Sequence, residues 1–297
     1  MKKTIKYLVR DIIRFFLRPK GYTYIRFLKT HKYLPKLTKP KTFSEKLIFR
    51  KFTVEPKELS EYVDKYTVRE HVKNSIGEQY LIPLIKSVTH LNVNDFSDLP
   101  NSFVMKTSNG GGGENVLIVE NKSELDLDKL CKQFNAYLKI EVGKAVDEHF
   151  YDIETPRIIF EKLIKQRNGG YPSDFKLHIF QGELEDDEKV IVQVDADRFE
   201  SHKRSLYSEN LQLLSYNIQP KYDNLGSGYD FPENMNTLIA LAKQLAKPFK
   251  YVRVDMYNVD GVIYFGELTF CHGSGWEPMS SKSVDELWGS YWNEFEK

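Results

Sequence analysis

Two carboxylates in the last quarter of the chain, Asp255 and Glu267, lie among apolar neighbours. Tyr251 to Phe265 has the composition of two strands joined by a tight turn at Asn258 to Gly261, so the two acids are expected to approach each other. An ionised carboxylate in apolar company is costly unless a cation or a donor compensates it. A salt bridge to Arg253 would do so. A divalent-metal site is the alternative, because hard oxygen ligands on adjacent strands suit a magnesium ion that carries a nucleotide phosphate.

A second segment, Phe103 to Glu120, favours the metal and nucleotide interpretation. It predicts a strand, a glycine loop and another strand, with Lys106 near the end of the first strand. The loop contains Gly110, Gly111, Gly112 and Gly113. Glycines let backbone N–H groups approach an anion closely, and the lysine supplies the opposite charge. There is no GK[ST] motif, so this is not a Walker loop. A glycine-rich hairpin over phosphates, with acids far downstream, is typical of ATP-grasp enzymes, whereas a plain surface turn would leave Lys106 unexplained.

A basic cluster follows the predicted strand Val190 to Val194. It consists of Arg198, His202, Lys203 and Arg204. It is either a solvated loop or a site for an acidic acceptor such as a uronic acid. The same segment contains Asp195-Ala196-Asp197, a DxD pattern that glycosyltransferases use to hold a metal and a nucleotide sugar. That match is short, and it leaves the Lys106 hairpin without a role.

The charge of the chain is unevenly distributed. The 297 residues suffice for one large domain or two lobes. Residues 1–51 hold 16 Lys and Arg against two acidic residues, while the remainder holds 27 against 40. A cationic front indicates an anionic partner. No nucleic-acid-binding fold accompanies it, so nucleic acid is not expected. Two cysteines make neither a disulfide framework nor a metal cluster. No segment predicts a signal peptide or a membrane span, which favours the cytoplasm.

The first helix is predicted over residues 3–18, ended by Pro19. Its apolar stripe contains Ile5, Leu8, Val9, Ile12 and Phe16, and lysines and arginines occupy the opposite side. Such a helix can lie on the inner face of the plasma membrane, against an anionic leaflet. Alternatively, the apolar stripe packs on the body of the protein.

The remaining pattern predicts an α+β fold. Thr42 or Ser44 begins a helix, residues 57–76 form another that Gly77 ends, and helices follow over 125–142 and 232–248. Strands are expected over 81–88, 157–164, 174–180 and 190–194, the last two as an antiparallel pair. Because the strands cluster with flanking helices and do not alternate with them as βαβ units, an α+β fold is favoured over a Rossmann fold.

Seven segments in this order resemble the TupA-like ATP-grasp family, which is associated with teichuronopeptide and other bacterial surface-polysaccharide biosynthesis. The similarity runs from Lys41 to Trp276. The segments are Asp64-Lys65-Tyr66-Thr67-Val68-Arg69, Phe103 to Gly113, Phe160-Glu161-Lys162-Leu163, Asp174-Phe175-Lys176, Gln193-Val194-Asp195 with Arg198-Phe199, His202-Lys203-Arg204, and Val252-Arg253-Val254-Asp255 with Phe265 to Phe270.

The resemblance implies an ATP-grasp fold, in which two α+β lobes hold ATP and magnesium between them. A basic helical extension (1–63) would precede a small lobe with a lead-in helix and glycine-rich lid (64–160) and a large lobe with the metal and acceptor site (161–297). Lys106 would contact the α- and β-phosphates under the lid Gly110 to Gly113. The hinge Glu161-Lys162-Leu163 would meet adenine, Asp174 the ribose, and Lys176 a phosphate or an acidic substrate.

By the same resemblance, Asp255 and Glu267 would hold magnesium, and Arg253 would steady charge on the transferred phosphoryl group. Many ATP-grasp enzymes have an asparagine two residues after the second acid. Here that position is Thr269, whose hydroxyl is a weaker ligand, so the number of metal ions stays open.

These observations lead to the expectation of a carboxylate–amine ligase that joins an amino acid or amine to an acidic sugar or peptide. A kinase acting on a glycan hydroxyl is the closest alternative, a metal-dependent glycosyltransferase a more distant one, and a non-catalytic nucleotide-binding module the last.

Overall fold

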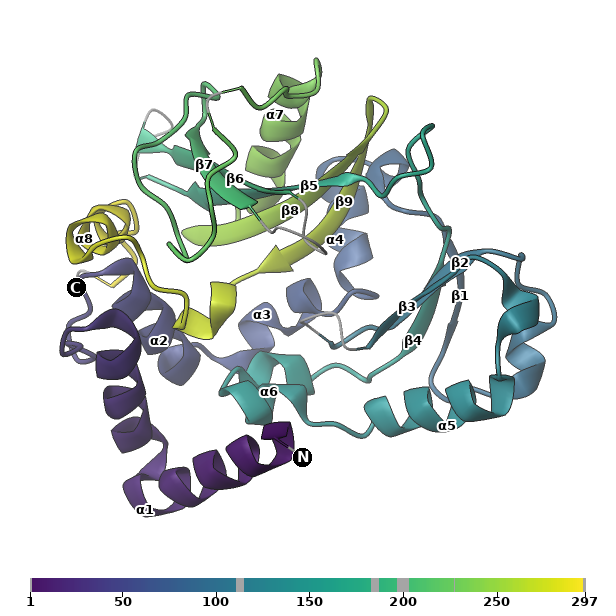
Figure 1. Cartoon of the computed structure of the whole chain (residues 1–297), viewed down its shortest axis with the longest axis horizontal. Coiled ribbons are helices and arrows are strands. Elements are labelled where there is room, and N and C mark those ends of the chain that lie inside the picture. The colour runs from purple at the N-terminus through teal and green to yellow at the C-terminus, as the bar shows by residue number, and fades with distance from the viewer. Residues whose placement is uncertain (1, 111–114, 183–186, 197–202, 227, 296–297) are drawn as a thin grey trace.

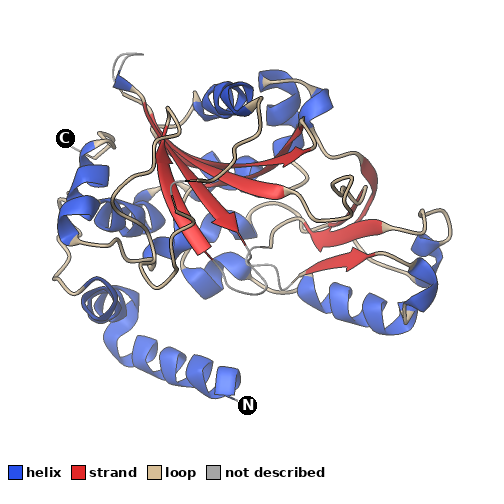
Figure 2. Ribbon diagram, turned by 45° about the horizontal axis from the view of Figure 1, so that its top comes forward, coloured by secondary structure: helices blue, strands red, loops and turns tan. Residues whose placement is uncertain are grey.

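Two antiparallel sheets of different size organise the chain (Figure 1). The structure is a computed structural model that describes residues 2–110, 115–182, 187–196, 203–226 and 228–295. Figure 2 shows the larger sheet as a fan of long strands with the smaller sheet beside it, and α1 projecting from the body towards the N-terminus. The α+β class and the two-sheet arrangement expected from the sequence are confirmed.

The helices are α1 (Lys2–His31), α2 (Phe43–Thr53), α3 (Pro56–Val63), α4 (Val68–Ser75), α5 (Leu127–Tyr137), α6 (Val142–Val146), α7 (Met235–Ala246) and α8 (Lys282–Ser290). Short 3-10 helices are η1 (Glu78–Tyr80), η2 (Val93–Phe96), η3 (Lys122–Glu124), η4 (His149–Asp152) and η6 (His272–Gly275). The strands are β1 (Leu84–Val88), β2 (Phe103–Thr107), β3 (Val116–Val119), β4 (Ile158–Glu161), β5 (Ser173–Phe180), β6 (Lys189–Ala196), β7 (Lys203–Ser208), β8 (Tyr251–Val259) and β9 (Val262–Thr269).

The smaller sheet has the strand order β1-β4-β2-β3. One of its faces packs on α5 around Phe103, Phe134 and Phe160. Lys106 and Glu161 lie on the neighbouring strands β2 and β4. The cross-strand partner of Glu161 is Val104, two residues before Lys106, so the two charged side chains lie diagonally across the strand pair. The sheet therefore presents a lysine and a glutamate side by side at the end nearest the rest of the protein.

The larger sheet has the strand order β7-β6-β5-β8-β9, and its two faces differ in chemistry. In β5 the residues Phe175, Leu177 and Ile179 point to one face, where α7 and the main hydrophobic core cover them. Successive side chains of a strand point to opposite faces. The intervening residues of β5 and their partners on β6 and β8 therefore form a second, polar face, which turns towards the smaller sheet. The alternation of polar and apolar residues along β5 therefore predicts that Asp174, Lys176 and His178 lie on the polar face.

The pairing of β8 with β9 places Asp255 directly opposite Glu267. A register shift follows at once between Asp255 and Met256, next to Gly266. A Cβ on Gly266 would lie 2.9 Å from the carbonyl oxygen of Asp255, so a larger residue would force the two strands apart. At the far end, Asp260 and Gly261 both have positive φ, as the expected tight turn requires.

The helix predicted over residues 3–18 ends where expected, at Arg18 (φ 57°) before Pro19. A second helical segment begins immediately and runs to His31, because Pro19 fits the first turn of a helix. Further on, Thr42 and Glu45 form a capping box at the start of α2.

The helix expected over 57–76 is wrong as a single element. It is divided into α3 and α4, because the Asp64 carboxylate accepts hydrogen bonds from the backbone N–H groups of Tyr66 and Thr67 and so turns the chain. Both helices contribute to the core of the larger sheet through Val63 and Val68. The division of the chain at residues 63 and 160 stays a prediction.

α2 and α8 close the remaining end of the larger sheet. Phe43 of α2 and Trp288 of α8 have ring centroids 5.3 Å apart, and both pack with Tyr251 of β8. The two helices approach so closely that a Cβ on Gly289 would lie 2.0 Å from the carbonyl oxygen of Lys41. The ammonium of Lys46 is buried here and donates to the carbonyl oxygen of Gly289 at 2.9 Å.

Candidate active site

The polar face of the larger sheet carries an ion-pair network centred on Asp255. Its carboxylate accepts hydrogen bonds from Arg253 at 2.6 and 2.8 Å and from Lys176 at 2.9 Å. Arg253 also lies 3.3 Å from Glu267. The sequence left a salt bridge and a metal site as alternatives for Asp255 and Glu267. The salt bridge to Arg253 is present at both acids, and it is compatible with a metal site.

The charges of this network stabilise one another. Burial by itself raises the pKa of Asp255, but Arg253 and Lys176 outweigh that effect and hold the pKa below its ordinary value. Burial likewise lowers the pKa of Arg253, and Asp255 and Glu267 more than offset it, so that the net shift is upward. Asp255 therefore stays an anion, and its two oxygens are held by Arg253 and Lys176.

The residues present fit magnesium. The side chain of Asp255 is 4% exposed and that of Glu267 is 38% exposed, so the second acid opens towards the space between the sheets. The Thr269 hydroxyl donates to Glu267 at 3.3 Å and accepts from Arg253 at 3.1 Å. Among the described residues no cluster of three or more metal-ligating side chains is found. Two carboxylates suffice for magnesium that is also held by phosphate oxygens and water.

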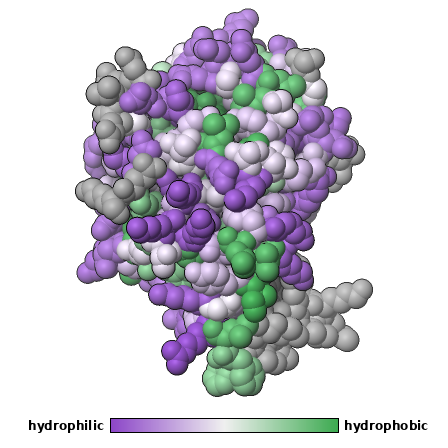
Figure 3. Space-filling view, turned by 90° about the vertical axis from the view of Figure 1, so that its left-hand side faces the viewer, coloured by the Kyte–Doolittle hydropathy of each residue, from purple (hydrophilic) through white to green (hydrophobic). Residues whose placement is uncertain are grey.

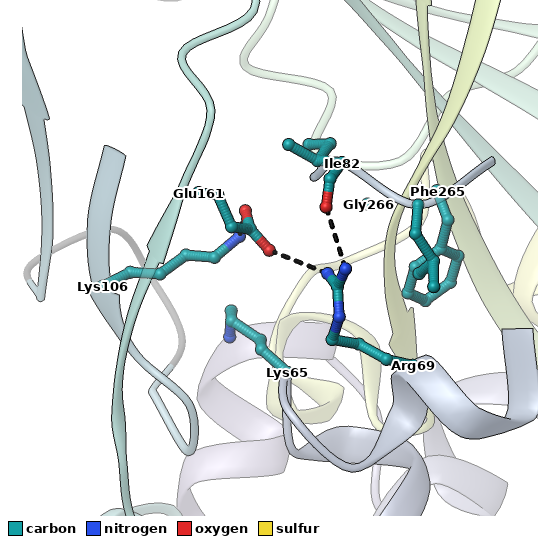
Figure 4. Close-up of a pocket in the computed structure, with 8 residues that line it drawn as sticks. Lys65, Arg69, Ile82, Lys106, Glu161, Phe265 and Gly266 are labelled. Carbon is teal, nitrogen blue, oxygen red and sulfur yellow. Dashed lines mark hydrogen bonds and ion pairs between the residues drawn. The ribbon is translucent and has the colours of Figure 1, made fainter. Parts of the chain in front are cut away.

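Three cations gather around one cavity: Lys106 of β2 in the smaller sheet, Arg69 of α4, and Lys65 between α3 and α4 (Figure 4). The ammonium of Lys106 lies 2.7 Å from the Glu161 carboxylate, whose other oxygen lies 3.4 Å from Arg69 of α4. Arg69 also donates to the carbonyl oxygen of Ile82 at 3.0 Å. Glu161, predicted at the adenine hinge, thus points its side chain at the cation predicted for the phosphates.

Lys65 connects the two sheets. Its ammonium donates to the carbonyl oxygen of Gly110, at the start of the glycine loop, and lies 4.0 Å from Glu267. Burial, with Lys106 nearby, lowers the pKa of Lys65 despite the opposing effect of Glu267. The sequence assigned Lys65 no role, although Asp64-Lys65 stands in one of the family segments. The one available indication was Asp64 directly before it, because an aspartate whose side chain bonds to the following backbone N–H groups turns the chain at that point.

A small cavity lies where the two sheets meet. The residues that line it are Lys65, Arg69, Leu81, Ile82, Lys106, Glu161, Phe265 and Gly266. Charged side chains and the apolar side chains of Leu81, Ile82 and Phe265 meet around it. Its accessible volume of about 10 Å³ has room for about one water molecule, so it marks a meeting point of the two sheets rather than a complete ligand pocket. Leu81 and Phe265 are candidate residues that sequence reasoning did not select.

The other predicted nucleotide residues are placed as follows. Lys162 is exposed, and its backbone N–H donates to the carbonyl oxygen of Pro83 at 3.0 Å. Leu163 is half-buried beside it. Asp174 is buried on the polar face, where it forms an ion pair with Lys176. Gly110 is described and buried, whereas Gly111, Gly112 and Gly113 lie outside the described residues. The roles assigned to these residues stay predictions.

The basic cluster, left by the sequence as either a solvated loop or a site for an acidic acceptor, includes the start of a strand. Lys203 and Arg204 begin β7, and Arg204 pairs with Asp195 across the sheet. The guanidinium Nε lies 2.6 Å from Asp195, and a second nitrogen lies 3.3 Å from Glu277. The strand forms because Arg204 is neutralised by both acids, which compensates its burial. Arg198 and His202 lie outside the described residues.

The same contact bears on the glycosyltransferase interpretation. Asp195 is engaged by Arg204 and by the Gln193 amide at 2.7 Å, and Asp197 lies outside the described residues. Asp195 is thus a buried ion-pair partner of the polar face.

Two buried histidines extend the polar face towards α8. The ring of His178 lies 3.0 Å from the Tyr251 hydroxyl and 3.2 Å from the Gln193 side-chain oxygen, a pattern that the neutral imidazole satisfies by accepting from the first and donating to the second. His272 lies 2.6 Å from Glu277, although not in hydrogen-bond orientation. Burial lowers the pKa of both imidazoles; at His272 Glu277 opposes the shift, and at His178 the neighbouring His272 adds to it.

These two histidines predict that stability falls as the pH is lowered. The unfolded chain binds protons near the ordinary histidine pKa while the folded chain does not, so unfolding is favoured below that pH. Each histidine contributes up to about 1.4 kcal/mol per pH unit. Urea unfolding between about pH 7.5 and about pH 5.5 should show this loss, and His178→Gln should flatten it.

The matched control is His90→Gln, which removes an exposed histidine and should keep the wild-type slope. Equal unfolding free energies of the wild type at both pH values would contradict the placement of the two imidazoles.

Two facing antiparallel sheets, one bearing cations beside a glycine hairpin and the other bearing paired acids, define an ATP-grasp enzyme. ATP and Mg²⁺ are the cofactors of that class. A family model narrows the assignment: the chain belongs to the TupA-like ATPgrasp family, whose model matches residues 45–293. The resemblance carried by the seven sequence segments is thereby confirmed.

Solved structures show distant likeness. An ADP complex of N5-carboxyaminoimidazole ribonucleotide synthetase is 18% identical with a TM-score of 0.45, and the match covers 71% of this chain and 45% of that one. D-alanine–D-alanine ligase from Helicobacter pylori is 16% identical with a TM-score of 0.41, covering 78% and 63%. The corresponding ligase from Bacillus anthracis is 21% identical with a TM-score of 0.38, covering 70% and 56%. This chain thus spans less than two thirds of each of these structures.

No curated protein matches the chain. Across the described residues, every helix falls short of the length and apolar character that crossing a bilayer requires.

Proposed function

We propose that this protein is an ATP-dependent ligase that joins the carboxyl group of an acidic sugar or peptide to an amino acid or amine, in the synthesis of a bacterial surface polysaccharide. The observation that supports it best is the position of Lys65. Its ammonium lies between the glycine loop and the metal acid Glu267, with Lys106 close by. A triphosphate in that space would meet cations on one side and a magnesium site on the other.

The chemistry then follows from the charges. A substrate carboxylate oxygen bonds to the γ-phosphorus as the bond to ADP breaks, which gives an acyl phosphate. The amine nitrogen next bonds to the carbonyl carbon, loses a proton, and inorganic phosphate leaves. Magnesium, held by Asp255 and Glu267, would neutralise phosphate charge. Lys65 and Lys106 add positive charge along the phosphates, and Arg253 holds Asp255 in place. Catalysis rests on positioning and charge compensation, so no nucleophilic side chain is required.

An acidic acceptor is supported by the cations on the remainder of the polar face. Lys176 and Arg204 lie on β5 and β7, beyond the metal acids, and each is held by an aspartate of the same face. A substrate carboxylate that competes for Lys176 would leave Asp255 paired with Arg253. One that competes for Arg204 would leave Asp195 with the hydrogen bond from the Gln193 amide. The link to surface polysaccharide rests on the family resemblance.

The kinase alternative shares the first half of this chemistry, since the same acids and lysines assist transfer of the γ-phosphoryl group to a hydroxyl. The two proposals differ in their products. A ligase releases ADP and inorganic phosphate and forms an amide, whereas a kinase releases ADP and keeps the phosphoryl group on the glycan.

The test is incubation with Mg-ATP, candidate uronic-acid glycans and amino acids, with mass measurement of the products and assay of free phosphate. A product with the mass of both substrates less one water, together with free phosphate, supports the ligase. A glycan heavier by one phosphoryl group and no free phosphate would establish the kinase instead.

A further inference from the structure

The second half of α1, from Pro19 to His31, has one buried side and one exposed apolar side. Thr23, Phe27 and His31, spaced four residues apart, are buried against the body. Tyr24, Ile25 and Leu28 turn away from it into solvent. Core packing thus accounts for one side of this helix and leaves the other unexplained.

The exposed apolar side continues in both directions. Phe15 and Phe16, before the kink, are 81% and 77% exposed, Ile25 is 56% exposed, and Leu34 after the helix is 70% exposed. Together with Leu17, Tyr24 and Leu28 they make what we call the α1 apolar strip. Figure 3 shows a continuous run of hydrophobic residues descending this face of the molecule to its lower end. Single exposed apolar residues are ordinary, but a contiguous strip of large ones marks a contact surface.

The charge around the strip is positive. Residues 12–44 contain nine Lys and Arg and no Asp or Glu. Of these, Lys20, Lys29 and Lys32 are exposed on or beside the strip. Lysines bordering exposed aromatic and aliphatic side chains are the composition of a helix that lies in the headgroup region of an anionic bilayer.

The helix that carries the strip is fixed to the active-site side of the protein. His31 lies 3.0 Å from the carbonyl oxygen of Gly275, in the η6 segment that follows β9. The Arg26 guanidinium stacks on the Trp276 ring at 4.1 Å. Further back, Arg14 forms an ion pair with Asp147 next to α6. The strip is therefore held rigidly, a short distance along the chain from the metal strand.

We propose that the α1 apolar strip docks on an anionic lipid bilayer and holds the cleft next to that surface. A second copy of the chain fits less well, because a two-fold interface would bring two basic surfaces against each other. Nucleic acid would match the charge but would leave the phenylalanines, Ile25 and Leu28 in water.

The experiment is flotation of the full chain with vesicles of phosphatidylcholine mixed with phosphatidylglycerol, against vesicles of phosphatidylcholine alone. The wild type should float with the anionic vesicles and be released by salt. The double variant Ile25→Asp and Leu28→Asp should bind on the order of tenfold or more weakly. Ile140→Asp is the matched control, since Ile140 is 49% exposed on another part of the surface, and should bind like the wild type.

Equal flotation of the double variant and the wild type would overturn the proposal, as would a wild type that never floats. A wild type that is dimeric, with a monomeric double variant, would assign the strip to self-association instead. Thermal unfolding of each variant should be measured to check that the fold is retained. Vesicle binding does not depend on the proposed ligase reaction, so either can fail while the other stands.

Discussion

Replacing Glu267 by glutamine is expected to abolish magnesium-dependent ATP turnover. The substitution keeps the shape of the side chain and removes the charge of one of the two carboxylates that we propose hold the metal. Several kcal/mol of phosphate charge stabilisation depend on the metal, and each 1.4 kcal/mol or so is tenfold in rate, so a loss of about 100-fold or more follows. Steady-state turnover at increasing Mg²⁺ should show a lower maximum and a raised metal requirement.

Glu267 is the better of the two acids for this experiment. Asp255 is buried and compensates both Arg253 and Lys176, so its replacement would leave buried cations underpaired and threaten the fold. Glu267 is more exposed, and its replacement would leave Arg253 paired with Asp255. Glu124→Gln, at an exposed glutamate on the smaller lobe, is the control and should keep full turnover. A fully active Glu267→Gln enzyme would mean that the metal is held elsewhere.

The second large effect is expected from Lys106→Ala, which should weaken ATP binding by about 10- to 100-fold, since a hydrogen bond to a charged group contributes about 1.5–3 kcal/mol. The fold should survive, because the buried partner Glu161 keeps Arg69 at 3.4 Å. Calorimetric titration with a non-hydrolysable ATP analogue and Mg²⁺ measures the change.

Lys86→Ala is the matched control for Lys106. Lys86 lies on β1 of the same sheet, and its ammonium pairs with Asp98 at 2.5 Å rather than with a residue of the candidate site. Its loss should leave nucleotide affinity unchanged. Unchanged affinity of Lys106→Ala would instead remove that ammonium from the phosphate site.

The site residues that lie on strands could be predicted because side chains alternate regularly between the two faces of a strand. Alternate residues share a face, so the spacing of Asp174 and Lys176, or of Arg253 and Asp255, determines that each pair lies together. That alternation needs only local sequence. The tight turn alone would place Gly266 opposite Asp255, and the register shift between Asp255 and Met256 brings Glu267 there instead.

The rest depended on contacts between distant segments. Lys65 reaches the cleft because Asp64 turns the chain between α3 and α4, and no periodicity signals such a turn. A solvated loop stayed open as one interpretation of Arg204, because its partners, Asp195 and Glu277, lie 9 and 73 residues away. Likewise, α1 continues past Pro19 because its second half finds a surface at Gly275. Tertiary contacts of this kind override local propensity.

The contact between α2 and α8 has a consequence for how the protein is made. α2 is synthesised well before α8, into which Lys46 and Phe43 fit. Until α8 has been made, Phe43 lacks the Trp288 ring against which it packs. The growing chain therefore carries part of its cationic and aromatic segment without this partner while the residues between the two helices are synthesised, and the contact can form only once both helices have left the ribosome.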